Sequence, residues 1–254
     1  MPVEIIAEVA TNHGGSVHLA KDFIWRCAEA GADWVKFQHT RVRHLRRNDP
    51  QYKWFLRAEF SCEQFAELKA ECELAGTKFL TTVYHWTDVP EVESLGVQAV
   101  KIGSGEAGEL ALAEAVMVTT IPRVFVSLGL TNNNPYESYF VRDKWANRDL
   151  VFLGCVTRYP APAGIAANVL RGHSVTWATT GPSWSVSGWS DHAIGLGECE
   201  AAIVGGATVI EKHVCLPHQA RSVQPWEATV AQIKQLRAFA DEDPQRFIGR
   251  WQHA

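Results

Sequence analysis

The stretch "TVIEKHVCLP", residues 208–217, combines a strand-like run of Val, Ile and Thr with three ionisable side chains, Glu211, Lys212 and His213. Alternate residues of a strand point to the same face, so Glu211 and His213 share one face and Lys212 takes the other. Burying a charge is costly unless the charge is paired or serves a function. In a (β/α)8 barrel, functional groups gather at the carboxyl ends of the strands. We therefore expect a functional face on this strand, with Lys212 in a structural role.

Seven further runs have the composition of buried strands, and they alternate with segments of helical period. The expected strands span 4–10, 33–38, 78–84, 99–103, 123–129, 149–155, 185–190 and 208–214. The expected helices span 16–31, 61–75, 87–95, 109–117, 135–146, 163–171, 195–206 and 227–240. This alternation predicts an α/β fold, a (β/α)8 TIM barrel, with a doubly wound parallel sheet as the competing architecture. No linker or change of composition divides the chain, so we expect a single domain over residues 1–254.

Composition narrows the class of protein. The chain is 46% hydrophobic, which is ample for a large core. Its net charge of -4 and its pI near 6.2 give no electrostatic footprint for nucleic acid or an anionic membrane. No apolar run reaches the roughly 18 to 20 residues that span a bilayer. The six cysteines form no CxxC pair. We expect reduced thiols, a cytoplasmic protein and small-molecule partners, with no nucleic acid or membrane, and we leave a homodimer open.

Polar side chains recur at the ends of the expected strands. They are Glu8, Lys36, Gln38, Thr82, Tyr84, Lys101, Ser104, Ser127, Ser190, His192, Glu211 and His213. A lone histidine on an apolar strand is more often a core residue than a ligand, but polar groups at so many strand ends are hard to explain by packing. Two histidines with nearby carboxylates suit a divalent metal. Two inward lysines with hydroxyl groups suit a phosphate or carboxylate ligand.

Six segments together resemble the sialic acid synthase (N-acetylneuraminate synthase) family. They are "IIAEVATNHGGS", "AGADWVKFQ", "KIGSGE", "RYPAP", "GWSDHAIG" and "GATVIEKH", and they follow one another in the family's order. Members of that family use a TIM barrel and a divalent metal. They join phosphoenolpyruvate to the aldehyde of an amino sugar, which gives a 3-deoxy-2-keto acid and phosphate. The resemblance implies a transferase of this kind.

The resemblance also implies roles for individual residues. It implies that a divalent metal, Mn²⁺ or Mg²⁺, is bound by His192 and His213. The positions that hold phosphoenolpyruvate correspond to Lys36, Thr82, Lys101, Ser104, Ser127 and Ser190. The sugar-aldehyde side corresponds to Glu8, Gln38 and Tyr159. The candidate catalytic acids are Glu8, Glu106 and Glu211.

Three features depart from the family pattern. The family usually carries a C-terminal antifreeze-like domain, whereas this sequence stops at Ala254, just after the last expected helix, so we expect the barrel domain alone. The family's "PGPDH" segment, with its sugar-binding Asp, has no match in "CLPHQARSVQPWEA", residues 215–228. Two strand ends, "TTV" at 81–83 and "SLGL" at 127–130, are also altered. We therefore expect an acceptor other than an N-acyl mannosamine.

The run "RVRHLRRNDPQYKWFLR", residues 41–57, is unusually basic. In a barrel it would follow the second strand, on the active-site face. It is either a solvated segment with ion pairs or a binding surface for an anionic acceptor.

Other functions compete with the synthase interpretation. "GSGEAG", residues 103–108, fits the GxGxxG pattern of a dinucleotide-binding dehydrogenase, but no ribose-binding acid ends the next strand. A metal-dependent aldolase or isomerase on the same barrel would also need two histidines, though not the anion-binding lysines and serines. A non-catalytic barrel that binds a sugar acid is a third alternative. Release of phosphate from phosphoenolpyruvate distinguishes the synthase from all three.

Overall fold

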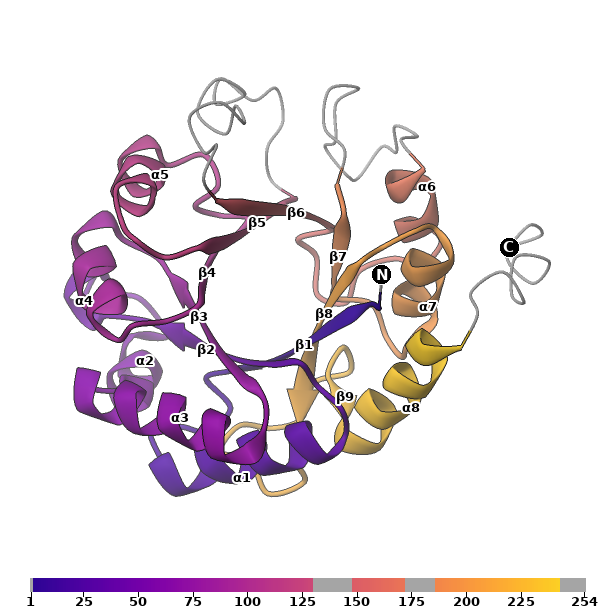
Figure 1. Cartoon of the computed structure of the whole chain (residues 1–254). Coiled ribbons are helices and arrows are strands. Elements are labelled where there is room, and N and C mark those ends of the chain that lie inside the picture. The colour runs from indigo at the N-terminus through magenta and orange to yellow at the C-terminus, as the bar shows by residue number, and fades with distance from the viewer. Residues whose placement is uncertain (1, 130–147, 172–185, 243–254) are drawn as a thin grey trace.

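The computed structural model describes residues 2–129, 148–171 and 186–242, and the strands within them form a barrel (Figure 1). The barrel strands are β1 (Glu4–Ala10), β2 (Trp34–His39), β3 (Lys78–Val83), β4 (Ala99–Ile102), β5 (Arg123–Leu128), β6 (Asp149–Cys155), β7 (Gly188–Asp191) and β8 (Val209–Cys215). Each strand pairs in parallel with the next, and β1 also pairs with β8, which closes the sheet. The prediction of a (β/α)8 barrel is confirmed, and the doubly wound sheet is excluded.

Helices surround the barrel and cover its outer face (Figure 1). They are α1 (Val17–Glu29), α2 (Tyr52–Ala58), α3 (Cys62–Ala75), α4 (Val89–Ser94), α5 (Leu110–Met117), α6 (Ala166–Leu170), α7 (Gly197–Val204) and α8 (Val230–Asp241). The expected helix at 135–146 lies outside the described residues. Helix α2 begins inside the basic run and ends one residue beyond it, and a short strand, β9 (Ala228–Thr229), pairs with β8. The sequence patterns did not predict β9.

Local signals account for where α3 begins and ends. Ser61 accepts a hydrogen bond from the backbone of Gln64, and the Gln64 side chain accepts one from the backbone of Ser61, so two otherwise unpaired N–H groups are satisfied. Phe60 and Phe65 meet across this turn with ring centroids 5.7 Å apart. The helix stops at Gly76, whose φ of 77° suits a residue without a Cβ.

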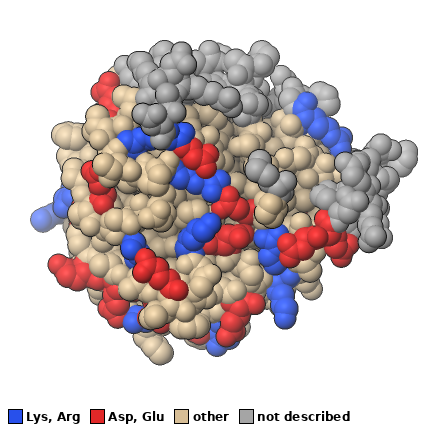
Figure 2. All heavy atoms as spheres, viewed as in Figure 1, with Lys and Arg blue, Asp and Glu red and all other residues tan. Residues whose placement is uncertain are grey.

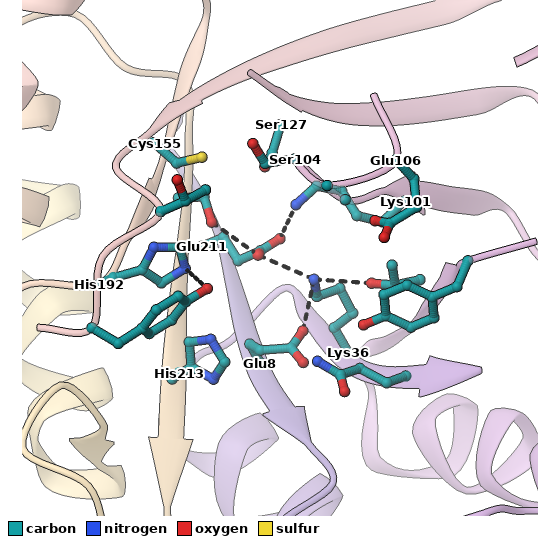
Figure 3. A pocket seen from close by; sticks show the side chains of 18 residues that line it. Glu8, Lys36, Lys101, Ser104, Glu106, Ser127, Cys155, His192, Glu211 and His213 are labelled. Carbon is teal, nitrogen blue, oxygen red and sulfur yellow. Dashed lines mark hydrogen bonds and ion pairs between the residues drawn. The ribbon is translucent and has the colours of Figure 1, made fainter. Parts of the chain in front are cut away.

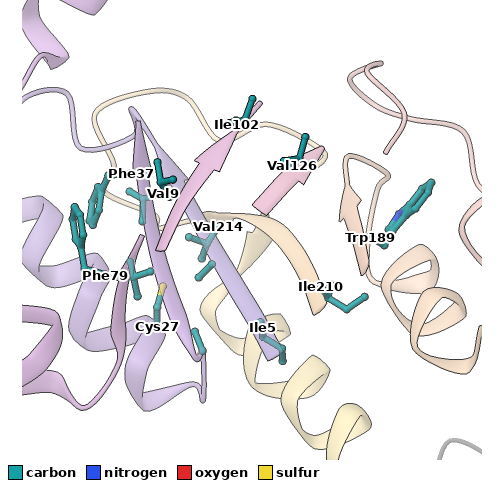
Figure 4. Packing of buried hydrophobic residues seen from close by; sticks show 14 of the residues in the cluster. Ile5, Val9, Cys27, Phe37, Phe79, Ile102, Val126, Trp189, Ile210 and Val214 are labelled. Carbon is teal, nitrogen blue, oxygen red and sulfur yellow. The ribbon is translucent and has the colours of Figure 1, made fainter. Parts of the chain in front are cut away.

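Two apolar layers lie on opposite faces of the strands. Outside the barrel, strand side chains such as Ile5 and Ile210 pack with helix side chains such as Cys27 (Figure 4). Inside it, a smaller cluster consists of Ile6, Trp34, Leu80, Ala99, Phe125, Val151, Leu153 and Val209. Two residues further along each of the first four strands, the same face carries Glu8, Lys36, Thr82 and Lys101. The interior therefore changes from apolar to polar toward the carboxyl ends of the strands.

The surface carries charges of both signs. On the face seen in Figure 2, Lys and Arg side chains lie interspersed with Asp and Glu. Within the described part of the chain, no helix is both long and apolar enough to cross a bilayer.

Candidate active site

A cavity of about 320 Å³ opens among the carboxyl ends of the barrel strands, within the volume range typical of small-molecule sites. It is lined by Glu8, Lys36, Gln38, Thr82, Tyr84, Lys101, Gly103, Ser104, Gly105, Glu106, Ser127, Cys155, Thr157, Tyr159, Ser190, His192, Glu211 and His213. Every candidate site residue from the sequence is therefore brought to one cavity. Cys155 and Thr157 were missed, although they continue the inward alternation of β6 beyond Leu153.

Glu211 lies at the centre of the polar groups (Figure 3). Its carboxylate accepts hydrogen bonds from Lys36 Nζ at 3.1 Å, Lys101 Nζ at 2.7 Å and Ser190 Oγ at 3.0 Å. Lys36 also forms an ion pair with Glu8, with 2.7 Å between Nζ and Oε2. The strand register explains this meeting, because Glu8 pairs with Lys36 on one side and Ser190 pairs with Glu211 on another.

The protonation of these groups follows from burial and charge. Burial alone would raise the pKa of Glu211, but the ammonium groups of Lys101 and Lys36 outweigh it and hold the pKa below its ordinary value. Burial lowers the pKa of Lys36 to about 7, against the opposing charge of Glu211. Burial raises the pKa of Glu106. An anion that enters the cavity therefore competes with Glu211 for the two lysines.

Hydroxyl groups lie beside the lysines. Ser104 Oγ accepts a hydrogen bond from the backbone N–H of Gly129 at 2.8 Å. Ser127 Oγ is buried and makes no hydrogen bond to any residue that the structure describes. A buried hydroxyl in this state is costly unless a ligand or water completes its bonding. Ser127 is thus a donor available to a bound anion.

His192 and His213 face each other with ring centroids 5.6 Å apart. His192 Nδ1 lies 2.7 Å from the carbonyl of Val156 and donates its proton to it, so Nε2 on the cavity side is the acceptor, and the Tyr159 hydroxyl donates to it at 3.0 Å. Burial lowers the pKa of His192, and it lowers the pKa of His213 further still, so both imidazoles are neutral and in the form that binds metals.

The histidine pair could hold a divalent ion only with additional ligands. Among residues 2–129, 148–171 and 186–242, no group of three or more His, Cys, Asp and Glu side chains could hold a metal by itself. The donor set fits an ion that is bound by two imidazoles and completed by oxygen atoms of water or substrate.

Aromatic rings border the histidines. The ring of Tyr159 lies 4.1 Å from that of His192 and 5.5 Å from that of Trp226, and its hydroxyl lies 3.0 Å from His192 Nε2. Trp226 comes from the segment between β8 and β9. Its neighbour Glu227 anchors this segment by accepting a hydrogen bond from the Asn12 side chain at 2.9 Å. This segment, which has no match to the family's "PGPDH", therefore reaches the cavity residue Tyr159 through Trp226.

The basic run at 41–57 forms ion pairs outside the cavity. Arg41 is buried and pairs with Glu91, and Arg43 pairs with Asp88. None of the described residues that line the cavity comes from this run. For these two arginines the predicted ion pairs are confirmed, although Arg41 is buried and not solvated as that interpretation expected.

Comparison with known proteins adds independent information. A model of the NeuB family matches residues 23–242. An uncharacterized protein of Methanocaldococcus jannaschii is 31% identical over 236 residues, which cover 89% of this chain and 68% of that protein. The N,N'-diacetyllegionaminic acid synthase of Campylobacter jejuni is 27% identical, and the match covers 92% of this chain and 76% of the synthase.

A solved structure shows the same fold. The N-acetylneuraminic acid (sialic acid) synthetase from Leptospira borgpetersenii, in complex with citrate, superposes with a TM-score of 0.85 at 24% identity. The superposition covers 98% of this chain and 86% of the synthetase.

Proposed function

The chain belongs to the NeuB family, and we propose that it is a transferase that condenses phosphoenolpyruvate with the aldehyde of a sugar-like acceptor. The reaction depends on a divalent metal and gives a 3-deoxy-2-keto acid and phosphate. One observation carries the proposal: a single cavity has two lysines and several serines on one side and two neutral histidines on the other. The first set suits an anion, and the second suits a metal.

In this proposal the lysine side binds phosphoenolpyruvate. Lys36 and Lys101 offer charge-assisted hydrogen bonds, and Ser127 offers a hydroxyl that makes no hydrogen bond within the described part of the chain. Thr82, Ser104 and Ser190 complete the set of hydroxyl groups around the anion. Such fixed donors orient the enol and stabilise charge as it develops.

The acids have separate tasks in the same scheme. The methylene carbon of phosphoenolpyruvate attacks the aldehyde carbon, and Glu106, whose pKa is raised by burial, can give a proton to the aldehyde oxygen. Water then adds at carbon 2, and ionised Glu211 can accept its proton. The tetrahedral intermediate expels phosphate. A divalent ion bound by His192 and His213, Mn²⁺ or Mg²⁺, would polarise the aldehyde oxygen as a Lewis acid.

The acceptor lies, in this proposal, beside Glu8, Gln38 and Tyr159. Trp226 packs on Tyr159 from the segment in which the family pattern has its sugar-binding Asp. We therefore propose an acceptor other than N-acetylmannosamine.

A phosphate-release screen tests the function. The protein is mixed with phosphoenolpyruvate, Mn²⁺ or Mg²⁺ and a panel of aldehydes that includes N-acetylmannosamine, its 6-phosphate and nucleotide-linked sugars. We expect phosphate release that depends on both the metal and an aldehyde. Aldehyde turnover without phosphoenolpyruvate would indicate an aldolase or isomerase, and binding of sugar acids without any turnover would indicate a binding protein.

Replacing Lys101 by Met should weaken the binding of phosphoenolpyruvate by about 1.5 to 3 kcal/mol, the usual worth of a charge-assisted hydrogen bond. The substitution also leaves Glu211 with one fewer counter-charge next to the ligand. Calorimetry measures the change. Lys78→Met is a matched control, because Lys78 lies on β3 outside the cavity with 57% of its side chain exposed. Equal affinities for phosphoenolpyruvate in the two variants would show that Lys101 does not bind this ligand.

The affinity for phosphoenolpyruvate should fall as the pH rises from 7 to 9. Burial lowers the pKa of Lys36 to about 7 in the free protein, so above that pH the anion must bind together with a proton. Because one proton is taken up on binding, the dissociation constant of phosphoenolpyruvate should rise by nearly tenfold per pH unit above pH 7. The phosphate group, with a second pKa near 6, stays ionised over this range. Lys36→Arg should flatten the profile because Arg keeps its charge. A pH-independent affinity in the wild-type protein would contradict the assignment.

A further inference from the structure

Lys212 and Asp191 form a buried ion pair outside the barrel interior. Their side chains are 0% and 1% exposed, and Nζ lies 2.5 Å from Oδ2. The two residues face each other in the register of β8 and β7. Cys199 of α7 donates a further hydrogen bond to Asp191. The structural role predicted for Lys212 is thus confirmed, and the contacts of the pair indicate what that role is.

The ion pair fixes the residues on both sides of His192, because Asp191 is one of its members and Ala193 is hydrogen-bonded to both. Lys212 Nζ donates to the carbonyl of Ala193 at 2.6 Å, and the N–H of Ala193 donates to Asp191 Oδ1 at 3.0 Å. The carbonyl of His192 itself accepts a hydrogen bond from Ala161 at 2.8 Å. The backbone that presents the imidazole is therefore fixed on each side, while the ring points into the cavity.

Stability alone is a weak reason for such a pair. Buried ion pairs can often be replaced by apolar side chains of similar volume without loss of stability, because burying the charges costs as much as their attraction returns. An apolar pair at these positions, however, could not bond to both backbone groups of Ala193. The hydrogen bonds, rather than the charges, distinguish the native pair from an apolar substitute.

We propose that Lys212 and Asp191 are positioning residues for His192, which keep its Nδ1 on the Val156 carbonyl and its Nε2 directed into the cavity. This inference rests on the proposed role of His192 as a metal ligand. It explains the order of side chains in β8: Glu211 and His213 face the cavity, and Lys212 between them fixes the histidine that directly follows the adjacent strand β7.

The double variant Asp191→Leu/Lys212→Met tests the proposal, because it replaces both charged side chains by apolar ones of similar shape. We expect a melting temperature close to that of the wild-type protein, whereas the single variants melt lower because each leaves one charge buried alone. We expect the Mn²⁺ affinity, measured by calorimetry, to fall by about 10- to 100-fold. This is the usual loss when a residue that holds a metal ligand in place is replaced. Wild-type Mn²⁺ affinity in the double variant would contradict the proposal.

A second readout does not need a metal. In ¹⁵N-histidine spectra, His192 of the wild-type protein should show one tautomer, protonated at Nδ1, and the double variant should show a mixture. The His192→Gln spectrum identifies the signal. If the wild-type protein bound no Mn²⁺, the proposed metal site would fail, and the tautomer alone would decide the positioning role. A single native tautomer in the double variant would overturn it.

Two further variants complete the experiment. If the double variant does not fold, Lys212→Met at low temperature takes its place with the same expected change of tautomer. Glu198→Gln is the matched control. Glu198 is a buried acid on α7 whose carboxylate accepts backbone hydrogen bonds from Gly164, Ile165 and Ala166. Its replacement should lower the melting temperature without changing the Mn²⁺ affinity or the tautomer, and a changed tautomer here would show that any loss of stability disturbs His192.

Discussion

Replacing His213 by Ala should lower the affinity for Mn²⁺ by more than about 100-fold. Losing a residue that only supports a metal ligand already costs about 10- to 100-fold, and His213 is itself a proposed ligand. Within the described residues, the metal would have only His192 and His213 as clustered protein ligands, so the loss of one leaves a single imidazole. We expect phosphate release from phosphoenolpyruvate to disappear with it. Chelation of the wild-type protein should have the same effect, and added Mn²⁺ or Mg²⁺ should reverse it.

His218→Ala is the control for this substitution. His218 follows the same strand, but its ring is 55% exposed and pairs with Asp22 on α1, away from the cavity. Its loss should leave both Mn²⁺ affinity and turnover unchanged. If His213→Ala kept wild-type metal content and rate, the metal site would have to be sought elsewhere.

The sequence was sufficient to predict most of the side chains that face the cavity, although it missed Cys155 and Thr157. Glu211 and His213 share a face because the side-chain period of a strand is two, and this period depends only on the backbone. The same argument places Lys36 with Gln38, and Ser190 with His192. The barrel itself followed from eight alternating units, because parallel strands need a helical crossover between them.

The contacts between strands could not be predicted in the same way. Lys36 and Glu211 are 175 residues apart in the chain, and they meet only because β1 pairs with both β2 and β8. The shear of the closed barrel determines which residues of different strands lie at the same height along the barrel axis. The sequence of a single strand does not encode this shear. Arg41 shows the same limit, since its partner Glu91 lies on α4, far along the chain.

Trp226 marks a second limit. The segment between β8 and β9 has no regular period, so the path that brings Trp226 to Tyr159 depends on individual contacts such as the hydrogen bond between Asn12 and Glu227. Periodicity carries no information about such a segment.

Replacing Glu211 by Gln should have opposite effects on binding and on chemistry. Glu211 occupies both lysines in the free protein, with side-chain distances of 3.1 Å to Lys36 and 2.7 Å to Lys101. A bound trianion such as phosphoenolpyruvate must share these lysines and lie near the carboxylate. Removing one negative charge a few ångströms away, at an effective dielectric constant near 20, is worth a few kcal/mol, so we expect binding to become about 10- to 100-fold tighter. Turnover should fall by about 10²- to 10⁴-fold, because the proposed proton acceptor is lost.

The stability of the Glu211→Gln variant supplies an independent check of this charge balance. Without a ligand, the variant leaves Lys101 buried without its carboxylate, a situation that costs up to about 3 to 5 kcal/mol, whereas Lys36 keeps Glu8. Phosphoenolpyruvate replaces the missing charge, so it should raise the melting temperature of the variant more than that of the wild-type protein. Calorimetric titration and thermal unfolding measure both effects, and Glu114→Gln on the exposed side of α5 is the matched control. If the variant bound phosphoenolpyruvate more weakly than the wild-type protein does, Glu211 would assist the ligand instead of competing with it, and the lysines would hold the anion through a different arrangement.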